Sequence, residues 1–428
     1  MLRRTDKFIF LSIFGLLLFL NFNRHSKHGS FNYHGELYAD KAGYHVFLPA
    51  LFYYDFDASR FPEDMDWKTG TGFKLDKKTN KVLTKYPIGV AILELPFFTL
   101  GAGIDALLGT KDNLGYSPVQ HKMIGLATIF YAVLGLLLLF KAFGKAYKPR
   151  LKYLVLFLLV FGSNFFFYIT RDAGLSHGYS FFVFAAIFYF LKKFFEENGD
   201  WKTITLLTTM MVLGCLIRPI NVLFIGIASF VFIAPNLTVL IHKKTALFKG
   251  FLWAVPIVLL LLIPQLLYYK YAFGDWFAYS YNDERFLYWF NPKLARVWFA
   301  PANGLVLYSP IYLIFVIGLW QYWKINKLQT GAIAFLFLSI SYLYASWWTP
   351  GLGCGYGHRG FIEFLPFFSI PIIFSLKQFK HKWFIGISAI IGTLYIVVLV
   401  LFQYKYDGCW YGNGYWDWQE LLLILGIK

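Results

Sequence analysis

The sequence predicts an all-α polytopic membrane protein with about eleven transmembrane helices. Of its 428 residues, 58% are hydrophobic and only 15% are charged, which is more apolar surface than a soluble chain of this length needs. The apolar residues form separate runs of about 20 residues, the length that crosses a bilayer as a helix. The net charge of +17 comes from Lys and Arg clusters between these runs, a pattern that indicates membrane topology rather than nucleic-acid binding.

The first apolar run extends from Phe8 to Phe22 and follows a basic N-terminus. It lacks a small-x-small cleavage site and continues into Asn23-Arg24-His25, so we interpret it as an uncleaved signal-anchor helix. The candidate spans along the chain are 5–23, 119–140, 152–170, 176–194, 203–219, 220–235, 248–269, 304–323, 330–347, 360–376 and 383–403.

One further run, 86–108, is apolar enough to span but contains Pro87, Pro96 and three glycines. If it does not cross, every loop on the N-terminal side carries Lys or Arg, including the dense cluster at 141–152. If it crosses, most of these loops lie on the opposite side. We therefore predict a re-entrant or surface helix at 86–108, with the N-terminus inside and the C-terminus outside. The outer side then holds the segments 24–118, 170–175, 270–303, 348–359 and 404–428.

The stretch 35–56 directly follows the first span and has a polar front and an apolar back. Read as a helix lying at the membrane surface, it places Glu36, Asp40 and Tyr44 on one face, because they are four residues apart. Asp40 is therefore a candidate functional carboxylate. The alternative interpretation is that Asp40 is a solvated charge on an interfacial helix.

Ionisable residues recur at the outer ends of later spans. They are Arg171, Asp172, His177, Arg218, His358 and Arg359. Such groups at membrane depth usually face a cavity, and cations beside a helix start can hold a phosphate. The glycines from Gly351 to Gly360 allow a sharp bend or close approach of a ligand to the backbone. The alternative is that each cation only extends toward the membrane surface.

Signals for metals and cofactors are weak. The pair Asp55-Phe-Asp57 resembles the Asp-x-Asp metal motif of soluble nucleotide-sugar enzymes, and the nine histidines show no metal-ligand spacing. No glycine-rich phosphate loop indicates ATP use. We therefore expect no cofactor, and a divalent metal is allowed but not supported. Cys354 and Cys409 both fall in predicted outer segments and could form one disulfide.

Together these features resemble the GT-C superfamily of integral membrane glycosyltransferases. The likeness is to the bacterial branch related to protein mannosyltransferases and to the aminoarabinose transferase of lipid A. The matching segments are Tyr38–Tyr44, Lys85–Gly89, Leu175–His177, Arg218–Asn221 and Gly355–Arg359. The resemblance covers most of residues 1–380, and its specific part is the order and sidedness of the segments.

The resemblance implies a glycosyltransferase that moves a sugar from a polyprenyl-phosphate-linked donor to a lipid, glycan or protein acceptor. It implies that Asp40 is the general base, with Glu36 as the second candidate. The implied substrate-binding residues are Tyr44, Lys85, Tyr86, Arg171, Asp172, His177, Arg218, His358 and Arg359. Two positions depart from the family pattern: Lys41 stands where an acidic residue is frequent, which weakens the case for a metal, and Ile88 stands where a second proline is frequent.

The resemblance also implies an organisation and a location. Residues 1–403 would form the GT-C-like membrane domain, with interfacial helices in the first outer loop 24–118, and residues 404–428 a short aromatic outer tail. The site would face the periplasmic or outer side of a bacterial inner membrane, in contact with membrane lipids.

Two other function classes stay open. A transporter or flippase of a lipid-linked or anionic solute is expected to carry charges near span midpoints and to have repeated halves. The polar residues of this sequence instead lie at the outer ends of spans, and no internal repeat is evident. A structural or assembly protein of the membrane would not need the outer cluster of ionisable residues.

Overall fold

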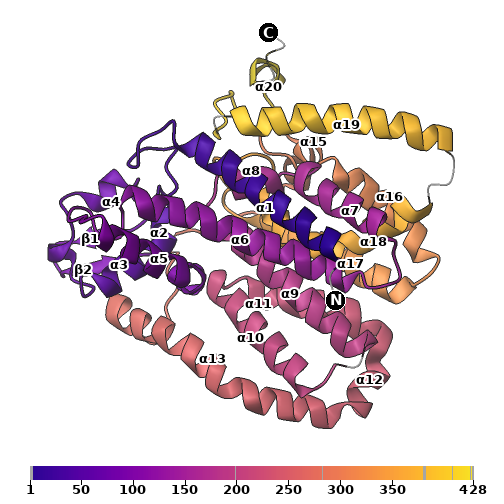
Figure 1. Cartoon of the computed structure of the whole chain (residues 1–428), viewed down its shortest axis with the longest axis horizontal. Coiled ribbons are helices and arrows are strands. Elements are labelled where there is room, and N and C mark those ends of the chain that lie inside the picture. Colours follow the sequence, from indigo (N-terminus) through magenta and orange to yellow (C-terminus); the bar gives the residue numbers. More distant parts are fainter. Residues whose placement is uncertain are drawn as a thin grey trace.

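Figure 1 shows the computed structural model of the chain; the structure describes residues 3–197, 199–281, 283–378, 382–406, 408–424 and 426. Within these ranges, eight helices are long and apolar enough to cross a membrane, and three shorter apolar helices accompany them. The prediction of an all-α polytopic membrane protein is confirmed, and the chain is an integral membrane protein.

Each predicted span falls on at least one helix. These helices are α1 (Arg4–His25), α6 (Pro118–Ala142), α7 (Pro149–Phe161), α8 (Phe165–Thr170), α9 (Ser176–Glu196), α10 (Trp201–Ile217), α11 (Asn221–Ile233), α13 (Lys244–Phe273), α15 (Leu305–Tyr308), α16 (Ile311–Trp323), α17 (Lys327–Ser346), η3 (Arg359–Phe364), α18 (Leu365–Gln378) and α19 (Lys382–Lys405). Side chains that accept a backbone N–H begin three of them: Ser117 before α6, Asp200 before α10 and Asn326 before α17.

The predicted span 152–170 is two helices rather than one. α7 ends at Phe161, and α8 begins after Asn164. Asn164 holds the break, because its N–H donates to Ser309 Oγ at 3.0 Å and its Nδ2 donates to the Tyr356 carbonyl at 3.1 Å. The break therefore anchors the glycine-rich loop that precedes η3.

The remaining elements are short, apart from α5. They are α2 (Asp40–His45), α3 (Phe47–Phe52), η1 (Ala58–Arg60), α4 (Met65–Lys68), β1 (Lys74–Asp76), β2 (Lys81–Leu83), α5 (Gly89–Leu107), η2 (Ala234–Asn236), α12 (Leu237–His242), α14 (Leu294–Phe299) and α20 (Trp418–Ile424). Strands β1 and β2 pair antiparallel, with Leu75 opposite Val82. In Figure 1 the elements from α2 to α5 gather at the left end of the molecule, where α6 begins and α13 ends. We call this the outer end, after the predicted topology.

The expectation of one interfacial helix over 35–56 is wrong. Helix begins only at Asp40, and the stretch forms α2 and α3 in succession. Ala39 interrupts any earlier turn because its φ is +51°, outside the helical range. Glu36 therefore does not share a helical face with Asp40 and Tyr44.

Both ends of α5 contact elements at the outer end. A Cβ on Gly89 would lie 2.4 Å from the Leu216 carbonyl carbon, so α5 begins against the end of α10. Near its other end, Asp105 accepts a hydrogen bond of 2.6 Å from Ser117, the residue before α6. By length and composition α5 is one of the eight helices that could span a membrane, so the re-entrant or surface placement of 86–108 stays a prediction.

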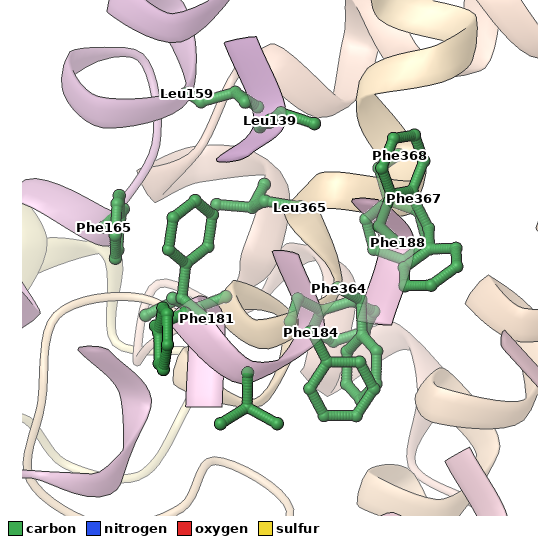
Figure 2. Close-up of a cluster of buried hydrophobic side chains, with 14 of the residues drawn as sticks. Leu139, Leu159, Phe165, Phe181, Phe184, Phe188, Phe364, Leu365, Phe367 and Phe368 are labelled. Atoms are coloured by element: carbon green, nitrogen blue, oxygen red, sulfur yellow. The ribbon is translucent and has the colours of Figure 1, made fainter. Parts of the chain in front are cut away.

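The core surrounds α9, whose residues are buried on nearly every face. Figure 2 shows aromatic side chains that join it to its neighbours. The Phe181 ring lies 4.3 Å from Phe165 of α8, and the Phe184 ring lies 4.8 Å from Phe364 of η3. A helix that is apolar all round is expected at the centre of a bundle. This packing fixes the outer start of α9, at Ser176, close to the candidate site.

Candidate functional site

A cavity of about 760 Å³ lies at the outer end, between α2, the turn before α9, the turn after α10 and the glycine-rich loop. We call it the first cavity. Eight of the predicted site residues line it. They are Asp40, Tyr44, Lys85, Tyr86, Arg171, Asp172, Arg218 and Arg359. The fold thus brings together side chains that the sequence distributes over more than three hundred positions.

Asp40 is the first residue of α2, and its side chain is 41% exposed. Ala39 before it donates its N–H to the Thr69 carbonyl at 2.8 Å. Gly72 packs so closely here that a Cβ would lie 1.8 Å from the Ala39 oxygen. The loop after α4 therefore holds the start of α2 and determines where Asp40 projects.

Lys41, the next residue, is an ion-pair partner inside the site. Its Nζ donates to Asp172 Oδ1 at 3.1 Å, and Arg171 Nη1 lies 3.5 Å from the same oxygen. Burial alone would raise the pKa of Asp172, but Lys41 and Arg171 outweigh it and lower this pKa to about 2. The two cations and the carboxylate thus connect α2 to the turn between α8 and α9.

Arg218 follows α10 and is held by side chains from three elements. Its Nε donates to Ser176 at 3.0 Å, and its Nη2 donates to His177 at 3.1 Å. Its Nη1 donates to Glu363 at 2.9 Å and to Tyr344 at 3.3 Å. Glu363 is buried and offsets the charge, while the guanidinium, 16% exposed, still lines the first cavity. The sequence analysis named His177 as a substrate-binding residue, but His177 does not line the first cavity. It accepts the hydrogen bond from Arg218 and so orients the guanidinium.

Arg359 begins η3 and lies 3.8 Å from Asp40, measured from Nη2 to Oδ2. Its Nη1 donates to the Cys354 carbonyl at 3.2 Å. Cys354 forms a disulfide with Cys409, a pairing that the sequence allowed but did not decide. Through this bond the C-terminal tail holds the loop that presents Arg359, and the tail contributes Gly408 to the cavity lining.

Two further predicted residues, Glu36 and His358, do not line the first cavity. Glu36 is buried and accepts a hydrogen bond of 3.1 Å from His121. Burial alone would raise the pKa of Glu36, but the bond to His121 helps lower it to about 2. Burial lowers the pKa of His358 to about 4, and its Nε2 donates to the Pro350 carbonyl. The His358 imidazole is therefore neutral at pH 7, and Glu36 is buried away from the first cavity.

Aromatic residues form the wall beside Asp40. The Tyr44 and Tyr86 rings lie 4.3 Å apart, and the Tyr44 hydroxyl donates to Ser176 Oγ at 3.3 Å. Lys85 Nζ lies 5.4 Å from the centre of the Tyr86 ring and pairs with Glu284 of the loop after α13. Burial, with a further contribution from Asp40, raises the pKa of Tyr86, so its hydroxyl stays protonated.

A second cavity, of about 1400 Å³, adjoins the first. Its other walls come from α4, the β1–β2 hairpin and the loop after α13. The residues common to both cavities are Ala39, Asp40, Lys85, Tyr86, Ser280, Tyr281, Glu284 and Trp348. Asp40 therefore lies at the boundary between two compartments, with a cation-lined cavity on one side and a wide cleft on the other.

Several lining residues were not predicted as site residues. They are Lys41, Ser280, Tyr281, Glu284, Tyr344, Trp348 and Gly408. Two signals in the sequence pointed toward them: the loop 270–303 was placed outside, and Cys409 was a candidate partner of Cys354. Neither signal identified an individual side chain.

No group of three or more His, Cys, Asp or Glu arranged to hold a metal ion occurs among the described residues. In the Asp55-Phe-Asp57 motif, Asp55 pairs with Arg60 at the surface. Asp57 caps η1 by accepting the Ser59 N–H at 2.8 Å. Both carboxylates thus have partners within their own loop.

No family profile and no curated protein matches the chain. Solved structures do match. ArnT from Cupriavidus metallidurans, bound to undecaprenyl phosphate, has a TM-score of 0.53 at 12% identity, over 92% of this chain and 69% of ArnT. Its apo form has a TM-score of 0.54 at 10% identity, over 93% and 65%. The archaeal oligosaccharyltransferase AglB from Archaeoglobus fulgidus, in complex with an inhibitory peptide and a dolichol-phosphate, has a TM-score of 0.50 at 11% identity, over 95% and 57%.

Both proteins are GT-C glycosyltransferases. The chain has a GT-C-like fold. At these identities the likeness shows the fold alone, and the chain spans just over half the length of AglB. The activity depends on the two cavities and the residues between them rather than on the fold.

Proposed function

We propose that the protein is an integral membrane glycosyltransferase that uses a polyprenyl-phosphate-linked sugar, with Asp40 as general base. The observation that carries this proposal is the position of Asp40 at the boundary of the two cavities, 3.8 Å from Arg359. A transfer reaction needs a donor compartment and an acceptor compartment that meet at a base. The GT-C-like fold, shared with structures that hold undecaprenyl phosphate and dolichol-phosphate, supports the same kind of donor.

The first cavity suits the donor because cations line it. Arg359 and Arg218 approach it from neighbouring elements, and Lys85 lies on its boundary with the second cavity. A guanidinium can give two parallel hydrogen bonds to a phosphate. The apolar side chains of Val222, Leu223 and Phe224 continue the lining along α11, which suits the first isoprene units of a lipid carrier.

The proposed reaction forms one bond and breaks one. The acceptor oxygen attacks the anomeric carbon, and the bond from that carbon to the phosphate oxygen breaks with its electron pair leaving on the phosphate. The proton of the acceptor hydroxyl passes to Asp40. The charge left on the polyprenyl phosphate is met by Arg359 and Arg218, so the leaving group needs fixed cations more than a general acid.

The proposed location is the outer side of a bacterial inner membrane. The Lys and Arg clusters between spans support this orientation. The Cys354–Cys409 disulfide lies at the first cavity, and disulfides persist in oxidising compartments such as the periplasm.

The test is sugar transfer by the full-length protein in liposomes that contain polyprenyl-phosphate-linked sugars. Asp40→Asn keeps the shape of the side chain and removes its basicity, so turnover should fall by about 10²-fold or more. Asp112→Asn is the matched control, because Asp112 is an exposed carboxylate of the same outer loop that lines neither cavity. Arg359→Lys should reduce transfer and Arg359→Ala should reduce it further.

Four results would overturn the proposal. Transfer by Asp40→Asn at the wild-type rate would exclude its role as base. Full activity of Arg359→Ala, or transfer from a nucleotide sugar alone, would exclude the phosphate site. Movement of the labelled lipid between leaflets without sugar transfer would favour the flippase alternative.

A further inference from the structure

We propose that the acceptor is an uncharged glycan that binds in the second cavity, with its sugar rings on Trp67 and Trp348. This inference rests on the proposed function and names the acceptor class of the same site. A glycan needs flat apolar surfaces for the C–H faces of its rings and many polar groups for its hydroxyls. The second cavity supplies both.

The two tryptophans are presented rather than buried. Trp67 lies on α4 and is 72% exposed, while Trp348 is 43% exposed and lines both cavities. Their backbones are fixed: the Trp67 carbonyl accepts the Gly70 N–H at 3.0 Å, and the Trp348 N–H donates to the Arg285 carbonyl at 3.0 Å. Exposed aromatic side chains on a fixed backbone, lining a cleft, indicate a binding surface. Trp348 lies at the boundary with the first cavity, which suits the sugar ring that receives the transfer.

The charged residues of the second cavity are of both signs. The cations are Lys74, Lys77, Lys78 and Lys85, and the carboxylates are Asp40, Asp64, Asp66, Asp76, Asp283 and Glu284. A polyanionic acceptor would require an excess of cations, which this lining does not have. Hydroxyl groups can donate to carboxylates and accept from ammonium groups, so a neutral, hydroxyl-rich chain suits a mixed lining.

A peptide acceptor that adds a strand to the β1–β2 hairpin is disfavoured by the hairpin edges. On β1, the N–H of the central residue Leu75 donates to Asp66 Oδ2 at 3.0 Å. On the other side, Lys81 of β2 already forms a bridge with Asp57. Strand addition needs free backbone groups along an edge, and both edges of this hairpin have partners.

In the proposed complex the hydroxyl of the terminal sugar of the glycan points to Asp40. The reaction is the one described above: the hydroxyl oxygen bonds to the anomeric carbon of the donor, polyprenyl phosphate leaves, and Asp40 takes the proton. The glycan can be free or carried on a lipid, since the second cavity recognises the sugar chain in both cases.

The experiment measures binding of defined probes to the full-length protein in nanodiscs. The probes are maltohexaose, cellohexaose and mannohexaose, each free and as a lipid glycoside, and a library of Ser-, Thr- and Asn-containing decapeptides. Saturation-transfer NMR identifies the contacting ring protons, and calorimetry gives the affinity. Trp67→Ala should weaken glycan binding by about tenfold, whereas Trp67→Phe, which keeps an aromatic face, should stay within about threefold. Trp416→Ala is the control, because Trp416 is half exposed and lines neither cavity.

The proposal is supported if at least one hexasaccharide binds and its binding depends on an aromatic ring at position 67. Binding of the free sugar and of the lipid glycoside with equal affinity assigns recognition to the glycan alone, and preference for the glycoside assigns part of it to the lipid. Binding of peptides but not of glycans overturns the inference, and so does binding of no probe at millimolar concentration. Polyprenyl phosphate binding is measured in parallel on the same variants. If the wild-type protein does not bind polyprenyl phosphate, the result counts against the proposed function. If it binds polyprenyl phosphate but no glycan, the result counts only against the acceptor class.

Discussion

Replacing Asp172 by Asn tests whether one buried ion pair holds α2, and with it Asp40, in place. The carboxylate accepts a hydrogen bond from Lys41 at 3.1 Å and lies 3.5 Å from Arg171. The Lys41 side chain is only 5% exposed. Asn keeps the shape of the side chain but leaves this ammonium group buried without its carboxylate partner.

The expected loss follows from the pKa of Asp172 and the burial of Lys41. The pKa falls from 3.8 to about 2 in the folded protein. One pKa unit corresponds to about 1.4 kcal/mol, so the ionised carboxylate contributes about 2 kcal/mol at neutral pH. This contribution is present above pH 3.8 and is lost as the pH falls toward 2. The unpaired ammonium adds to the loss, and breaking a buried pair from one side costs about 3–5 kcal/mol. Lys41→Met should cost less, because Asp172 then keeps Arg171.

The assay is unfolding of the purified protein in detergent, followed by circular dichroism, with Asp112→Asn as the control. We expect Asp172→Asn to be less stable to unfolding than both Lys41→Met and the control. The double variant Lys41→Met with Asp172→Leu should recover part of the stability that Asp172→Asn loses. Transfer activity of Asp172→Asn should also fall, because α2 carries Asp40. An Asp172→Asn protein that unfolds like the control, or a Lys41→Met protein that is destabilised more, would refute this account of the pair.

Three further predictions concern the disulfide, a buried histidine and the topology. Cys409→Ser should lower the melting temperature under oxidising conditions and match the reduced wild type, since a bond across 55 residues contributes about 4 kcal/mol in the chain-entropy model. Acidification from pH 7 to pH 5 should destabilise the protein by about 2 kcal/mol through His358, whose pKa is about 4 when folded and 6.5 when unfolded. His358→Gln should flatten this part of the stability profile, and an unchanged profile would contradict the assignment. A cysteine in place of Tyr147 should react with an impermeant maleimide only after cells are permeabilised, and labelling of intact cells would reverse the predicted topology.

The amino-acid sequence was enough to predict the membrane fold, and its Lys and Arg clusters predict that the long polar segments share one side of the membrane. Runs of about 20 apolar residues have few alternatives to a spanning helix, because a backbone in lipid must satisfy its own hydrogen bonds. The placement of 86–108 outside the bilayer rests on the Lys and Arg clusters of the loops and stays a prediction, because α5 is long and apolar enough to span. Arg359 could be selected because ionisable groups at membrane depth are costly and usually face a cavity, whereas Asp40 was selected from its place after the first span and from the family resemblance.

Which of these ionisable residues share a cavity, and which carry a charge, depends on the three-dimensional packing. Glu36 and Asp40 are four positions apart and looked equivalent on a helix, but the positive φ of Ala39 separates them, and Glu36 pairs with His121 instead. His358 is adjacent to Arg359 in sequence, yet burial keeps its imidazole neutral. The charge of a side chain, and whether it lines a cavity, depend on its burial and on partners from distant segments. A sequence periodicity or motif contains no information about that burial or those partners.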